Sequence, residues 1–201
     1  MITKEKIIES IRLTAKQISE HTDYSKFPGV YAFLLNDKSS LKEFGQPNRV
    51  LYVGIAKDSL ADRDLGNHFN SNSTGRSTLR RSLGAILKDN FDLRVFSRNG
   101  TSNNREILNY VFNINGDKRL TEWMEKSLII GYWEDKNKIQ YNQLRDLEEQ
   151  VIKVLQPTLD LDNRTRKYNP FADKLDSLRE NCRIEALENA KKGLTRKTYG
   201  D

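Results

Sequence analysis

Cysteine is almost absent from this chain, and other features that mark common protein classes are missing too. Cys182 is the only cysteine among 201 residues, so neither an intrachain disulfide nor a cysteine-based zinc site can form. No run of about 18 apolar residues occurs, which argues against a membrane span. The N-terminus lacks the apolar core and the small-residue cleavage site of a secretory signal. We therefore expect a cytoplasmic protein that is not inserted in a membrane.

Signatures of several enzyme classes are also lacking. The chain has two histidines, His21 and His68, and it contains no paired histidine ligands, no glycine-rich phosphate loop and no Ser/His/Asp arrangement. These absences argue against a zinc hydrolase, a P-loop enzyme and a serine hydrolase. The length of 201 residues suits about one domain with room for extra elements.

Positive charge is in mild excess and is unevenly distributed. The net charge is +6 and the sequence pI is near 9.3. Residues 71–98 hold six arginine or lysine residues against two aspartates, and residues 164–201 hold ten basic against six acidic residues. Such clusters are compatible with nucleic-acid binding, and equally with two solvated surfaces.

Hydrophobic periodicity predicts a mixture of helices and short strands. The predicted strands are residues 30–35, 50–56 and 128–134, with a weak short strand at 93–96. The predicted helices are residues 4–19, 58–69, a helix capped by Ser77, 120–126, 143–155 and a charged helix from Pro170 onward. The residues from Gly100 to Gly116 are ambiguous.

One carboxylate lies on an apolar helix face. On the predicted helix 143–155, at about 100° per residue, Glu148 falls within the arc of Leu144 and Leu155, whereas Glu149 falls outside it. A carboxylate in this position needs a compensating partner, which can be an arginine, a set of hydrogen bonds or a metal ion. An edge position that reaches solvent is the alternative.

Two tripeptides connect these observations to a known family. Gly29-Val30-Tyr31 on the first strand and Tyr52-Val53-Gly54 on the second resemble the two halves of the motif that names the GIY-YIG nucleases. Arg63 and His68 follow the second half at about the family's distances. The helix containing Glu148 ends in Gln156-Pro157-Thr158-Leu159 and is similar to the family's glutamate helix.

The resemblance spans roughly residues 27–163 and implies an α+β fold. The expected core is a small three-stranded antiparallel sheet flanked by helices, with an insertion at about 70–120. Residues 1–26 would add an N-terminal helix, and residues 164–201 a charged helical tail.

The resemblance also implies a metal-dependent endonuclease acting on DNA, with RNA as the alternative substrate. Glu148 would hold one Mg²⁺ or Mn²⁺ ion, and Arg63 would bind the phosphate. Tyr31 would be the general base, Tyr52 would orient the water or phosphate, and His68 would hydrogen-bond a tyrosine or the phosphate. Restriction, defence and repair are the expected settings.

Further residues are predicted to contact nucleic acid. The expected phosphate contacts are Arg76, Arg80 and Arg81, which we place on the outer side of a helix start. The lysine that often follows the family's second glycine is Ile55 here, and Lys57 is expected to replace its charge. The family's asparagine after the helix-ending proline is Asp160, and Asn163 is expected to substitute for it.

These two departures keep alternative functions open. A catalytically inactive nucleic-acid-binding module with the same fold is one alternative. A protein-interaction subunit that docks through the charged tail helix is another. The sequence predicts neither the oligomeric state nor the sequence specificity.

Overall fold

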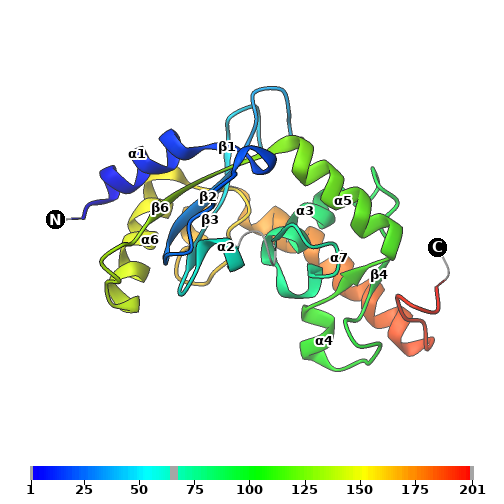
Figure 1. Ribbon diagram of the computed structural model, residues 1–201. Coiled ribbons are helices and arrows are strands. Elements are labelled where there is room, and N and C mark those ends of the chain that lie inside the picture. The colour runs from blue at the N-terminus through cyan, green and yellow to red at the C-terminus, as the bar shows by residue number, and fades with distance from the viewer. Residues whose placement is uncertain (1, 64–67, 200–201) are drawn as a thin grey trace. The chain divides into compact units, whose positions relative to one another are not determined.

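The protein has an α+β fold in a computed structural model that describes residues 2–63 and 68–199 (Figure 1). The chain divides into two compact units. Unit 1 contains Met1–Gly66 and Met124–Ala172, and unit 2 contains Asn67–Trp123 and Asp173–Asp201. Within the described residues, no helix has both the length and the apolar character that crossing a membrane requires.

Unit 1 is built on a small antiparallel sheet of four strands in the order β1-β6-β2-β3. The strands are β1 (Lys16–Gln17), β2 (Gly29–Leu35), β3 (Val50–Ala56) and β6 (Leu128–Glu134). The three strands expected from the sequence are confirmed, and the two-residue β1 extends the sheet beyond β6. β3 forms the opposite edge of the sheet, and this position matters for the site described below.

The apolar core of unit 1 lies on one face of this sheet. Successive residues of a strand point to opposite faces, so Val30, Ala32 and Leu34 share a face, which Val53 of the paired strand continues. Helices α1 (Lys4–Thr14) and α6 (Tyr141–Leu155) cover that face through their apolar sides. The periodicities that predicted both helices therefore reflect burial against the same sheet face.

The C-terminal ends of α1 and α6 are each set by a specific local feature of the sequence. The helix expected over residues 4–19 stops at Thr14, where the Tyr132 amide donates to the Thr14 hydroxyl at 2.7 Å and ties the chain to β6. Helix α6 ends at Gln156, which adopts a left-handed conformation with φ of 47° directly before Pro157. The predicted helix stop at Gln156-Pro157 is thus confirmed.

The remaining elements are short, apart from two helices. Unit 1 also contains the 3₁₀ turns η1 (Ile18–Glu20) and η4 (Arg166–Tyr168) and the helix α2 (Leu60–Arg63). Unit 2 contains η3 (Thr74–Arg76), α3 (Thr78–Ile86), β4 (Val95–Phe96), α4 (Asn104–Leu108) and β5 (Val111–Phe112). The longer helices are α5 (Ile114–Ser127) and α7 (Ala172–Lys191). The helix predicted over 58–69 is observed only as α2, and residues 64–67 lie outside the described part.

Unit 2 is organised around the buried helix α3 and the antiparallel pair β4–β5. The Ser77 hydroxyl accepts a hydrogen bond from the Arg80 amide, so the predicted N-cap is confirmed. Gly84 is required because a Cβ there would collide with the ring of Phe112. α7 joins the same unit through Asn189 and Glu185, which hydrogen-bond the Val95 carbonyl and amide respectively.

The expected exposure of Arg80 and Arg81 was wrong. The Arg80 side chain is 0% exposed and forms an ion pair with buried Asp117. It also donates to the Thr74 hydroxyl at 2.8 Å and to the His68 carbonyl at 3.0 Å. Arg81 is buried and donates to the Thr74 and Gly75 carbonyls. Both guanidinium groups hold the chain of unit 2 in place and are withdrawn as phosphate contacts.

We expect Arg80→Ala to lower the free energy of unfolding by about 3 kcal/mol. Removing one partner of a buried ion pair leaves an uncompensated charge, which typically costs about 3–5 kcal/mol. The lower end applies because Asp117 keeps a second contact with Arg196 at 3.1 Å. Urea denaturation followed by circular dichroism measures the change. Arg76→Ala, at an exposed position four residues earlier, should change stability by less than about 0.5 kcal/mol. Equal stabilities would contradict the structural role.

Candidate active site

The two motif tyrosines lie on the sheet face opposite the apolar core. Tyr31 on β2 pairs in register with Gly54, and Phe33 pairs with Tyr52, so both tyrosines share this face. Their ring centroids are 6.2 Å apart with an angle of 31° between the planes. Tyr31 is 0% exposed, whereas Tyr52 is half-buried. The Tyr52 side chain is therefore the more accessible member of the pair.

The position of the Tyr31 ring explains why residue 54, in the second half of the motif, is a glycine. A Cβ added to Gly54 would lie 2.5 Å from the Tyr31 hydroxyl oxygen and 2.6 Å from the Tyr31 Cζ. No side chain fits there, because the ring of Tyr31 crosses directly over the Gly54 backbone. The two tripeptides singled out in the sequence are thus in direct contact. Tyr31 of the first tripeptide leaves room only for a glycine at position 54 of the second.

Arg63 ends the helix that covers the same face. A Cβ on Gly29 would collide with the Trp133 carbonyl oxygen and would lie 2.9 Å from the side chain of Leu60. Because Leu60 begins α2, this helix packs beside Gly29 of β2, which is two residues before Tyr31 and on the same face of the sheet. Arg63, the last residue of α2, is half-buried. The structure therefore places Tyr31, Tyr52 and the helix bearing Arg63 on one face of unit 1.

Glu148 lies in a different part of unit 1, near the outer edge of β3. Its side chain on α6 is 10% exposed, and its carboxylate pairs with Arg164 at 3.2 Å. Arg164 also contacts Glu149 at 3.5 Å and Asp162 at 3.3 Å. Burial raises the pKa of Glu148 to about 7, and the hydrogen bond from Arg164 acts against this rise. Of the partners left open by the sequence, an arginine is the one observed.

Asp160 is a buried carboxyl group beside Glu148. Its Oδ2 accepts a hydrogen bond from the Val53 amide at 3.3 Å, on the edge of β3, while its buried Oδ1 has no hydrogen-bond partner. Burial raises the pKa of Asp160 well above its usual range, and the nearby Glu148 carboxylate raises it further. Two adjacent buried carboxyl groups disfavour each other's ionisation, and a cation bound between them would relieve that cost.

The other predicted site residues are distributed over both units. His68 belongs to unit 2, where its buried ring lies 2.8 Å from the Ser77 hydroxyl, between Nδ1 and Oγ. Lys57 is exposed, with its Nζ 5.9 Å from the centroid of the Tyr141 ring. Asn163 and Arg76 are exposed in units 1 and 2 respectively. The roles proposed for these four residues stay predictions.

Comparison with known proteins determines the family. A family model described as the GIY-YIG catalytic domain matches residues 29–181. This protein belongs to the GIY-YIG family. No curated protein and no solved structure matches the chain.

Membership of the GIY-YIG family gives these residues a common context. The family is generally one of endonucleases that use divalent metal ions, so a nuclease-type function acting on nucleic acid follows in general terms. The GIY-YIG match starts at Gly29, the first residue of the motif, and includes both Glu148 and Asp160. Among the described residues, no group of three or more histidine, cysteine, aspartate or glutamate side chains has a geometry suited to a metal ion.

Two residues beside Glu148 were not singled out from the sequence as candidates for this site. Arg164 is the ion-pair partner of Glu148. The sequence did not indicate this role, because a single arginine in a polar segment belongs to no hydrophobic pattern and no motif. Asp160 was treated only as a departure from the family pattern, with exposed Asn163 as its substitute. Asp160 is buried together with the preceding Thr158 and Leu159, and no periodic pattern in the sequence marks this burial. Ile55 packs against the apolar core of unit 1.

Proposed function

We propose that this protein is a metal-dependent endonuclease that hydrolyses phosphodiester bonds of DNA. The proposal is supported chiefly by two adjacent buried carboxyl groups, Glu148 and Asp160, at the edge of the strand that carries Tyr52 in a GIY-YIG chain. Burying two such groups is costly unless positive charge compensates them, and the observed ion pair with Arg164 involves Glu148. The single cysteine, which forms no disulfide, suits a cytoplasmic setting.

The residues present fit a hard divalent cation. Mg²⁺ and Mn²⁺ prefer oxygen ligands, and carboxylates are their usual protein ligands. Glu148 and Asp160 would hold the ion, since the unpartnered Oδ1 of Asp160 is an available ligand. The ion supplies charge neutralisation at the phosphate and at the leaving oxygen. Arg164, which neutralises Glu148 in this structure, would keep the site compact around both carboxylates.

The remaining chemistry is assigned to two side chains beside the same edge strand β3, which are Tyr52 on that strand and Arg63 on the neighbouring helix α2. The planar guanidinium of Arg63 would bind the scissile phosphate. A general base must reach the attacking water, and Tyr52 has exposed surface whereas Tyr31 has none. We therefore assign proton removal to Tyr52 and give Tyr31 the positioning role. This reverses the assignment made from the sequence.

Analysis of the product ends tests this proposal. A labelled DNA duplex incubated with the protein and Mg²⁺ should yield 5′-phosphate and 3′-hydroxyl ends, because water attacks phosphorus and the 3′ oxygen leaves. A DNA ligase should reseal such ends. An RNA duplex of the same sequence, treated in parallel, distinguishes the two substrate classes. DNA that stays intact both in Mg²⁺ and in Mn²⁺ would contradict the proposal.

The biological setting is proposed to be restriction, defence or repair. Cleavage of undamaged DNA that lacks methylation would support restriction or defence. Preference for a duplex containing a lesion would support repair.

The ion pair between Glu148 and Arg164 favours a second candidate function. A glutamate engaged by an arginine can serve as a purely structural group, and the chain would then bind nucleic acid without cutting it. Retention on DNA with no cleavage under any divalent ion would identify this inactive module. The protein-interaction alternative predicts no retention on DNA at moderate salt.

We expect Asp160→Asn to weaken Mn²⁺ binding at least about tenfold. The substitution keeps the size of the side chain and removes its charge, and the charge of the ligands sets the affinity of such sites. Isothermal titration calorimetry in the absence of DNA measures the binding constant. Asp162→Asn is the matched control, because its carboxylate is two residues away and 55% exposed. Equal affinities for the two variants would remove Asp160 from the metal site.

A further inference from the structure

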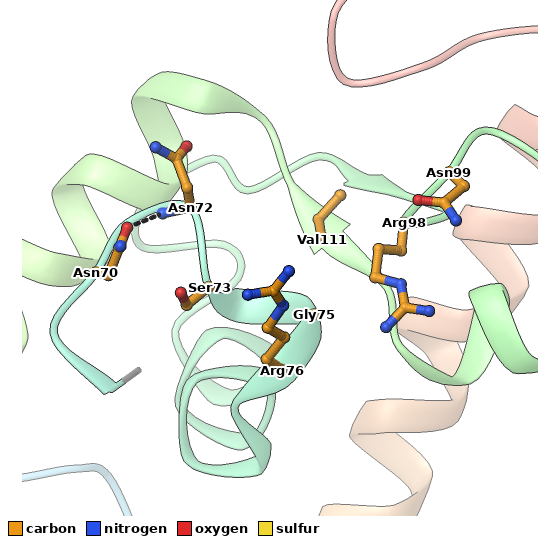
Figure 2. Close-up of a pocket in the computed structure, with 8 residues that line it drawn as sticks. All are labelled: Asn70, Asn72, Ser73, Gly75, Arg76, Arg98, Asn99 and Val111. Atoms are coloured by element: carbon orange, nitrogen blue, oxygen red, sulfur yellow. Dashed lines mark hydrogen bonds between the residues drawn. The ribbon is translucent and has the colours of Figure 1, made fainter. Parts of the chain in front are cut away.

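Unit 2 contains a polar cavity of about 560 Å³ that the active site does not use (Figure 2). We call it the amide–arginine pocket. Its lining residues are Asn70, Asn72, Ser73, Gly75, Arg76, Arg98, Asn99 and Val111. A second cavity of about 480 Å³ shares Asn72, Arg98, Asn99 and Val111 with it and continues to Thr195, Arg196 and Lys197. The two cavities adjoin each other within unit 2, because they share these four lining residues.

One wall of the pocket is a tightly held loop. The Asn72 amide donates to the Asn70 Oδ1 at 2.9 Å, as Figure 2 shows, and the Ser73 amide donates to the Asn70 carbonyl. From the interior, Arg81 donates to the Gly75 carbonyl at 2.8 Å. Gly75 passes so close to its surroundings that a Cβ there would lie 2.8 Å from the Arg98 Cδ. The buried arginines of α3 therefore fix this wall.

Positively charged side chains line the amide–arginine pocket. Among the residues that the structure describes, neither cavity has an aspartate or a glutamate in its lining. Arg98 is fixed by a bidentate pair with Glu106 at 2.8 and 2.7 Å, and Arg196 by Asp117. Arg76 and Lys197 are exposed, and neither has an ion-pair partner among the described residues. In Figure 2, Arg76 projects from the turn that contains Gly75, and Arg98 projects from a separate segment beside it.

We propose that the amide–arginine pocket binds a phosphodiester segment of the DNA substrate. Arg76 and Lys197 would contact phosphates, because an exposed cation without an acidic neighbour is suited to the charged backbone. The amides of Asn72 and Asn99 offer both donors and acceptors, which match the edge of a base. Two adjoining cavities of about 560 and 480 Å³ exceed the size of one phosphate group and suit more than one nucleotide. This inference rests on the proposed function of the protein.

Binding measured against salt concentration tests the pocket. The test variant is Arg76→Ala/Lys197→Ala, and the control is Arg105→Ala/Lys118→Ala, which removes two exposed charges of unit 2 outside the lining. Duplex binding is measured in EDTA, so that no cleavage occurs. Each lost phosphate contact should reduce the salt slope by about 0.9, so the test variant should lose nearly 2 and the control nothing. Equal slopes for the two variants would overturn the proposal.

Two further measurements distinguish DNA from smaller anionic ligands, and distinguish failure of the pocket proposal from failure of the proposed hydrolysis. Inorganic phosphate and a mononucleotide are offered to the wild type, and displacement of either by duplex DNA supports the proposal. Binding of these small anions with an unchanged duplex slope in the test variant would overturn it. If the wild type cuts DNA and the test variant binds like the control, the pocket proposal alone fails. If the wild type does not cut and the test variant still loses slope, only the proposed hydrolysis fails.

Discussion

Glu148→Ala should lower the rate of DNA cleavage by at least about 10³-fold while leaving DNA binding nearly intact. The carboxylate would hold the divalent ion rather than the DNA, and a catalytic ion contributes several kcal/mol to transition-state stabilisation. Each 1.36 kcal/mol corresponds to a factor of ten in rate. Single-turnover cleavage of a labelled duplex gives the rate, and gel retardation in EDTA gives the affinity.

Glu149→Ala is the matched control for this variant. Glu149 is the neighbouring glutamate on α6 and contacts the same Arg164, at 3.5 Å, but its side chain is 33% exposed against 10% for Glu148. Loss of Glu149 should change the cleavage rate by less than about threefold, because a half-exposed ion pair contributes little. If Glu149→Ala is the inactive variant and Glu148→Ala is active, the assignment of the metal ligand is wrong.

Tyr52→Phe should slow cleavage by about 10²–10⁴-fold, the range expected for loss of a positioned acid or base. Only the hydroxyl is removed, so the packing of the ring against β2 and β3 is kept. The general-base role predicts a pH-dependent cleavage rate in the wild type, and this pH dependence should be lost in the variant.

Tyr31→Phe provides the comparison for the tyrosine pair. Tyr31 shares the sheet face with Tyr52 but is fully buried, so its hydroxyl should act through the position of Tyr52 and Gly54. We expect a smaller loss of rate and an unchanged shape of the pH profile. A larger loss in Tyr31→Phe, with the pH dependence abolished, would restore the assignment of Tyr31 as the base. Circular dichroism of both variants confirms that the fold is kept.

Local patterns predicted most of unit 1. The strands at 30–35, 50–56 and 128–134 were found because β-forming residues cluster there, and the observed strands match within one residue. The helical arc placed Glu148 inward, and that residue is 8% exposed. The family resemblance then implied that these three strands form one antiparallel sheet, which is observed. In each of these cases, the residues that determine the structure are close in sequence or lie on one face of a single helix or strand.

Unit 2 was predicted less well because its structure depends on distant partners. Arg80 was placed outside on the assumption that α3 has a solvent face, but Leu79 through Ile86 are all buried. Its partner Asp117 is 37 residues away, and no pattern in the sequence relates the two. The pair β4–β5 likewise consists of two-residue strands, which are too short to give a period. The residues at 100–116 were ambiguous for the same reason.

Treatment of supercoiled plasmid with the purified protein tests the central claim most directly. Wild-type protein and Glu148→Ala are purified identically and incubated with the plasmid in Mg²⁺, in EDTA, and in EDTA followed by excess Mg²⁺. We predict nicked and then linear plasmid only for the wild type with available Mg²⁺. Plasmid that stays supercoiled with the wild type in both Mg²⁺ and Mn²⁺, or that is nicked equally by Glu148→Ala, would contradict metal-dependent hydrolysis at this site.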